Sequence, residues 1–164
     1  MLNPFQPKVH QKLAHTRLLL AMTQECGADL MDRQKSEALL SAAVMSFGVA
    51  FTLYLKELAA NHQLSGVEQI HTFEQLQYAL TSSGKVETAV AELDALMADG
   101  WVGELQLAVH QAQYPAPAAP LQGSVQMINA VSAPEFSVTE AWLLSSLTAF
   151  EQMTDRQRHS NLEY

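Results

Sequence analysis

The stretch ALLSAAVMSFGVAFTLYL, residues Ala38 to Leu55, decides the fold because it contains 18 residues and no charged side chain. Such a stretch is either a membrane-spanning helix or a helix enclosed by other protein. A membrane span needs about 20 mostly large apolar residues, whereas this stretch includes Ser41, Ser46 and Gly48. We therefore expect a helix enclosed by other helices, and insertion into a membrane is the alternative.

The composition predicts a single folded domain over residues 1–164. A chain of 164 residues can bury a sizeable core, and a 48% share of hydrophobic residues is too high for a disordered protein. Charged residues make up only 16% of the chain, fewer than is usual for the surface of a soluble monomer. We therefore expect some apolar surface to meet a second copy or another protein.

Acidic and basic residues are unevenly distributed along the chain, whose formal net charge is -8. Residues 1–56 hold six Lys or Arg and four acids, whereas residues 57–135 hold nine acids and one basic residue, Lys85. Nucleic acids and anionic lipids attract basic patches. The charge pattern therefore predicts a protein that binds neither nucleic acid nor a membrane.

The N-terminal third predicts a long helical hairpin. A first helix begins at Pro7, which suits a first helical turn, and ends near Cys26, where Gly27 can stop it. The uncharged stretch then belongs to a second helix that ends near Ala60. Cys26 is the one cysteine of the chain, so it forms no intramolecular disulfide, and its acidic neighbours do not favour a reactive thiolate.

The middle of the chain predicts shorter helices. Thr72 and Gln75 have the spacing of a capping box, which marks the start of a helix. The stretch Val86–Met97 has the apolar periodicity of an amphipathic helix. We expect a break near Gly100 and a further helix that ends near Gln113.

A proline-rich strap precedes the last predicted helix. Residues 114–123 (YPAPAAPLQG) contain three prolines and predict a stiff internal linker. Ser137 and Glu140 form a second candidate capping box, ahead of a helix over Thr139–Arg158. The chain is thus predicted to be all-α: an antiparallel helical bundle with a long hairpin of the first two helices, shorter helices, and a C-terminal helix after the strap.

Four residues are candidate metal ligands, because imidazole and carboxylate groups bind transition metals. Glu68 and His71 have the Glu-x-x-His spacing of di-iron bundles, but such bundles need two copies and the chain has one. A looser single-metal site would draw on His62, His71 and His110. The simpler interpretation is solvent-facing or helix-capping histidines, so we predict no metal, no cofactor and no catalytic residue.

Other catalytic patterns do not fit. Ribonucleases of the HEPN class carry an Arg followed by His after four to six residues, whereas two residues separate Arg156 from His159. The sequence has no glycine-rich phosphate loop, dinucleotide fingerprint or nucleophile elbow.

The order of these pieces resembles an uncharacterised family of short helical proteins from gamma-proteobacteria, a domain of unknown function. The resemblance rests on Gln11-Lys12-Leu13 in the first helix, on Lys56-Glu57-Leu58 near the end of the second, and on Trp101 at the start of a later helix. It implies a bacterial, cytoplasmic, helical protein and assigns no functional residue. The likeness to HEPN bundles is one of fold only.

The sequence therefore predicts a non-enzymatic helical interaction or scaffold protein in the cytoplasm. It would self-associate or bind a protein partner through apolar surface on its first and last helices. The alternative is a bundle that binds a metal or a small ligand, with or without enzymatic activity.

Overall fold

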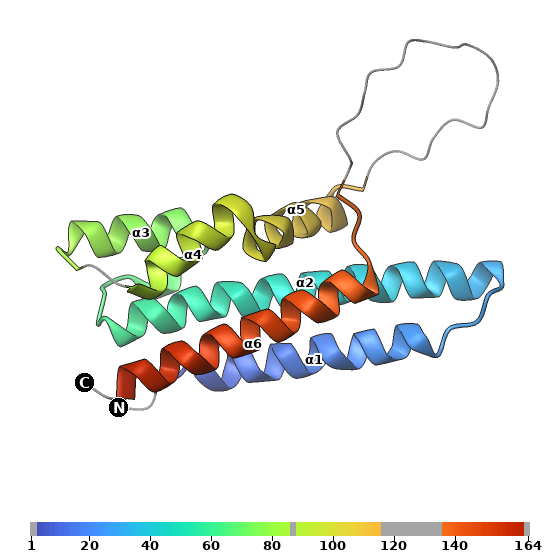
Figure 1. Ribbon diagram of the computed structural model, residues 1–164, viewed down its shortest axis with the longest axis horizontal. Helices are drawn as coiled ribbons and strands as arrows, with labels where there is room; N and C mark the ends of the chain where they lie inside the picture. Colours follow the sequence, from blue (N-terminus) through green and yellow to red (C-terminus); the bar gives the residue numbers. More distant parts are fainter. Residues whose placement is uncertain (1–2, 86–87, 116–135, 163–164) are drawn as a thin grey trace, which may run out of the picture.

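The computed structural model describes residues 3–85, 88–115 and 136–162, and this part of the chain is helical, with no strand (Figure 1). The predicted all-α fold is confirmed. The elements are α1 (Gln6–Gln24), α2 (Leu30–Asn61), the 3-10 turn η1 (Val67–Gln69), α3 (Phe73–Ser82), α4 (Thr88–Asp99), α5 (Trp101–Gln113) and α6 (Glu140–Leu162).

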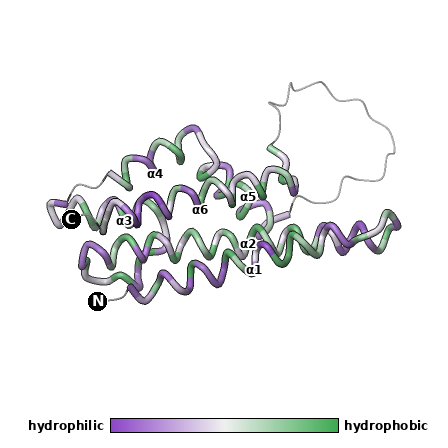
Figure 2. Tube along the Cα trace, turned by 60° about the horizontal axis from the view of Figure 1, so that its bottom comes forward, coloured by the Kyte–Doolittle hydropathy of each residue, from purple (hydrophilic) through white to green (hydrophobic). Residues whose placement is uncertain are grey.

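Helices α1 and α2 form the predicted long antiparallel hairpin. The chain reverses between them through two aspartates: the Asp29 carboxylate accepts a hydrogen bond from the N–H of Asp32 (2.8 Å), and the Asp32 carboxylate accepts one from the N–H of Gly27 (2.8 Å). Cys26 lies in this connection, half-buried. The end of the hairpin formed by this connection, which we name the hairpin tip, projects beyond the other helices in both views (Figures 1 and 2).

Helix α2 is the centre of the bundle, because α1, α3, α5 and α6 all contact it. Its uncharged stretch buries Phe47, Phe51 and Tyr54 on one face, whereas Ala42 and Val49 on another face are exposed. The interpretation of an enclosed helix therefore holds for one face of α2 only. Among the described residues, α2 is also the one helix that is long and apolar enough to cross a membrane, judged by length and composition. Within its most apolar stretch of 18 residues, 39% is buried.

An aromatic cluster joins three helices in the core. The ring of Phe150, on α6, lies 5.6 Å from Phe47 and 5.4 Å from Tyr54 on α2, and 5.7 Å from Trp101 on α5, measured between ring centroids. Phe150 is fully buried, and these pairs have the edge-to-face geometry that aromatic rings prefer. The cluster holds the C-terminal helix against the hairpin.

Short sequence patterns correctly predicted several helix boundaries. The Thr72 side chain accepts a hydrogen bond from the N–H of Gln75, whose own side chain accepts one from the N–H of Thr72, so the predicted capping box is confirmed. The break near Gly100 is also confirmed, because α4 ends at Asp99 and α5 begins at Trp101 with Gly100 extended between them.

Other boundaries differ from the prediction. Helix α6 begins at Glu140, and the hydroxyl of Thr139 accepts a hydrogen bond from the N–H of Trp142 (3.1 Å), so Thr139 is the cap and the prediction of Ser137 was wrong. The described part of α4 begins at Thr88, and residues 86–87, with which the predicted helix starts, lie outside the described part. Of the predicted linker 114–123, the structure describes Tyr114 and Pro115, and residues 116–123 lie outside it.

The tight junction between α4 and α5 depends on Gly103, and Gly103→Ala is expected to destabilise the fold by about 1 kcal/mol, the middle of a range of about 0–2 kcal/mol. A Cβ atom there would overlap the backbone oxygen of Met97, which cannot rotate away, and overpacking of this kind costs about 1–3 kcal/mol, offset by about 1 kcal/mol of improved helix propensity. Urea denaturation measures the effect. Gln106→Ala, at an exposed position of the same helix, is the control, and equal stability of the two variants would contradict the prediction.

Candidate functional site

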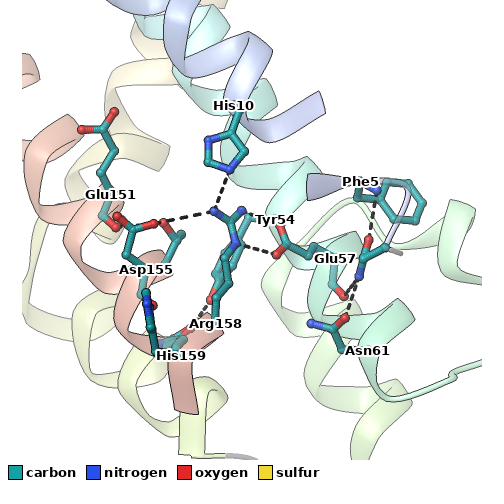
Figure 3. Close-up of polar contacts among 12 residues, drawn as sticks. Phe5, His10, Tyr54, Glu57, Asn61, Glu151, Asp155, Arg158 and His159 are labelled. Carbon is teal, nitrogen blue, oxygen red and sulfur yellow. Dashed lines mark hydrogen bonds and ion pairs between the residues drawn. The ribbon is translucent and has the colours of Figure 1, made fainter. Parts of the chain in front are cut away.

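A buried ion pair between Glu57 and Arg158 joins α2 to α6 (Figure 3). Glu57 is close to Asn61, the end of α2 that lies away from the hairpin tip. Glu57 lies on the buried face of α2 and is only 2% exposed. Arg158 donates to both of its carboxylate oxygens, from Nε and Nη2, each at 2.8 Å. This two-point geometry is the strongest that an arginine and a carboxylate can form.

The pair with Glu57 favours the charged form of Arg158, which arginine also keeps in water. Burial by itself would lower the pKa of the guanidinium, but the hydrogen bonds and charge of Glu57 outweigh burial and raise the pKa of Arg158 above its ordinary value. Arg158 therefore stays protonated, and Glu57 neutralises it. The remaining guanidinium nitrogen of Arg158, Nη1, lies 3.1 Å from Nε2 of His10 on α1 and 3.9 Å from Oδ1 of Asp155.

A second polar chain runs beside the ion pair. The buried hydroxyl of Tyr54 donates to the side-chain oxygen of Gln157, whose amide nitrogen donates to Glu92 on α4 (2.7 Å). Asn3 donates to the backbone oxygen of Glu57 (2.8 Å), which adds the segment before α1 to the same cluster. These bonds connect four parts of the fold that are far apart in sequence.

The polar cluster around Glu57 and Arg158 is better suited to holding helices together than to catalysis. The structure brings an Arg and a His together, as in the HEPN class, but through Arg158 on α6 and His10 on α1 rather than through Arg156 and His159. A phosphate group would have to displace Glu57 from Arg158, which would leave a carboxylate buried without its cation. We therefore assign the cluster a structural role.

The predicted metal candidates do not form one site. Within residues 3–85, 88–115 and 136–162, no three His, Cys, Asp or Glu side chains lie where they could hold a metal together. The Glu68 carboxylate accepts a hydrogen bond from Lys56 (3.0 Å), which lowers the pKa of Glu68, and the ring of His110 packs against Tyr114 at 5.1 Å. His62 caps the end of α2, and His71 is one of the residues that line a surface hollow.

Two hollows flank a ridge of α2 formed by the half-buried Met45 and the exposed Val49. The first, of about 260 Å³, lies between α2 and α5, and its mostly apolar wall includes Phe51 and Val109. The second, of about 460 Å³, lies between α2 and α1. We name the two hollows and the ridge together the α2 groove. Residues that line the second hollow include Lys12, His15, Leu18, Leu19, Ala42 and Ser46.

The buried pair and the α2 groove were not recognised from the sequence, although part of the signal was present. Glu57 continues the helical spacing of Phe47, Ala50 and Tyr54, so the spacing alone puts an acid on the buried face of α2. A buried carboxylate requires a cation as its partner. The partner of Glu57 is 101 residues away. No local pattern identifies a partner at that distance.

Residues 2–164 match the model of a family described as a family of unknown function, DUF6586. This match confirms the expected resemblance to a domain of unknown function. Neither a curated protein nor a solved structure matches the chain.

Proposed function

Because the chain belongs to this family of unknown function, we propose a function from its own surface: a non-enzymatic helical interaction protein that self-associates or binds a protein partner. The supporting observation is the exposure of large apolar side chains on the α1/α2 hairpin. Leu18 is 61% exposed and Val49 42%, while Leu30 and Met31 at the hairpin tip are 72% and 74% exposed. Concentrations of exposed apolar surface mark interaction sites.

This surface differs in place from the one expected from the sequence. Large exposed apolar residues on the described part of α6 are limited to Leu144, whereas α1 and α2 carry five. The second helix therefore takes the place of the last one in the proposed contact. The α1 and α2 residues are Leu18, Met22, Leu30, Met31 and Val49.

The experiment is light scattering of the purified protein over a wide concentration range, with mass spectrometry of any protein that co-purifies. Val49→Glu is expected to weaken the association at least about tenfold, because an unpaired carboxylate would be buried in the contact. Leu144→Glu, at a similarly exposed apolar position on α6, is the matched control and should leave association unchanged. A monomer at every concentration, with no stoichiometric partner, would refute the proposed function.

A small-ligand function is the second candidate, favoured by the hollow between α2 and α5. Its wall is mostly apolar, and its lining residues include the polar His71, Gln106 and Gln113, which is the usual composition of a ligand pocket. Native mass spectrometry of protein purified without affinity tags would detect a retained ligand, and elemental analysis would detect a metal. Recovery of the protein only with detergent would instead favour α2 as a membrane helix.

A further inference from the structure

The α2 groove is a basic site in an acidic protein. Lys12 and His15 line the hollow on its α1 side, and no Asp or Glu of the described residues lines either hollow. The whole chain has a net charge of -8. The absence of carboxylates from the groove therefore contrasts with the rest of the surface.

Lys12 is one of several basic residues whose charge no acid pairs within the described residues, and it is the one that lines the α2 groove. Arg17 pairs with Glu151, Arg158 with Glu57, and Lys56 with Glu68. Lys12 makes no ion pair within the described residues, and α1 itself contains no acidic residue. Its ammonium group is thus available to a carboxylate from outside the chain.

The shape of the groove suits a helix. Ala42, Met45 and Val49 follow the i, i+3, i+7 spacing of one helical face, so the ridge runs along the α2 axis with a hollow on each side. From Ala42 to Thr52 this face is about 15 Å long at the rise of an α-helix, which is about three turns of a docked helix. Helices that bind grooves do so with apolar residues at similar spacings.

We propose that the α2 groove binds the apolar face of an acidic amphipathic helix from a partner protein, with its carboxylates next to Lys12 and His15. The inference rests on the proposed function and names the class of partner. A two-fold contact between copies is disfavoured, because it would place the cations of both grooves together without a carboxylate. An anionic membrane is disfavoured by the negative charge of the whole protein.

The test is selection from a displayed library of random 16-residue peptides against the full-length protein. The selected peptides are expected to combine an i, i+3, i+4, i+7 apolar stripe with Asp or Glu beside it. A representative peptide should bind Val49→Glu and Lys12→Glu at least about tenfold more weakly than the unchanged protein, by fluorescence anisotropy. Its charge-reversed version, with Lys for each acid, should prefer the Lys12→Glu variant.

Leu144→Glu is again the matched control, and circular dichroism checks that each variant is folded. Groove-dependent peptides that are neutral or basic would overturn the inference and leave the proposed function intact. Peptides that bind Val49→Glu as tightly as the unchanged protein would also overturn the inference. It would be overturned as well if no peptide is selected and the protein instead binds vesicles of phosphatidylcholine and phosphatidylglycerol in a way that depends on Val49. Dimerisation that is lost in Val49→Glu would support the proposed function and refute the acidic partner.

Discussion

Replacing Arg158 with methionine is expected to lower the free energy of unfolding by about 3–5 kcal/mol, the usual cost of leaving a buried charge without its partner. Glu57 is 2% exposed and receives two hydrogen bonds from Arg158, and methionine supplies neither. Urea denaturation followed by circular dichroism measures the loss.

Two further variants test whether the loss of stability comes from leaving the charge of Glu57 buried without a partner. Arg17→Met removes an ion pair to Glu151 in which the arginine side chain is 50% exposed, so it should cost less than about 1 kcal/mol. Combining Arg158→Met with Glu57→Leu removes both charges and should recover most of the lost stability, since apolar replacement of a buried pair is often neutral. Equal losses for Arg158→Met and Arg17→Met would show that Glu57 is solvated.

Phe150→Ala is expected to have an effect of similar size, about 3–5 kcal/mol, because removing a buried phenylalanine ring loses its burial energy and leaves a cavity. Phe150 is fully buried and its ring contacts the rings of Phe47, Tyr54 and Trp101. Thermal and urea denaturation measure the loss. Tyr78→Ala, at a side chain that is 77% exposed, is the control and should change stability by no more than about 0.5 kcal/mol.

If Phe150→Ala unfolds as cooperatively as the unchanged protein and with a loss below about 1 kcal/mol, α6 does not pack on the hairpin as described. Phe150→Leu separates ring loss from volume loss. It keeps most of the apolar bulk and should lose less stability than Phe150→Ala. A similar loss in both variants would assign the energy to the ring contacts.

Much of the fold could be predicted from the sequence because local physics controls helix boundaries. The hairpin, the Thr72 capping box and the break at Gly100 follow from the conformational preferences of single residues. The start of α6 could not be predicted so well, because Ser137 and Thr139 are both competent caps. The rings of Phe136 and Trp142 pack at 5.1 Å beside them, a contact that capping preference does not describe.

The candidate sites were harder to predict because they depend on contacts distant in sequence. Glu68 and His71 would share a face only in a continuous helix, but η1 ends at Gln69 and Ile70 is extended, so the Glu-x-x-His spacing has no structural meaning here. The pairing of Glu57 with Arg158 and the absence of acidic residues from the walls of the α2 groove depend on how separate helices pack. Such packing is fixed by the whole core rather than by any short pattern.

The connection between α1 and α2 provides a built-in reporter position. Cys26 is the one cysteine of the chain and lies half-buried in this connection, near the exposed Leu30 and Met31. A maleimide dye or nitroxide attached to this thiol therefore marks a single place, without any engineered substitution. Changes in its emission or spin mobility on mixing would distinguish contact at the hairpin tip from contact along the α2 groove.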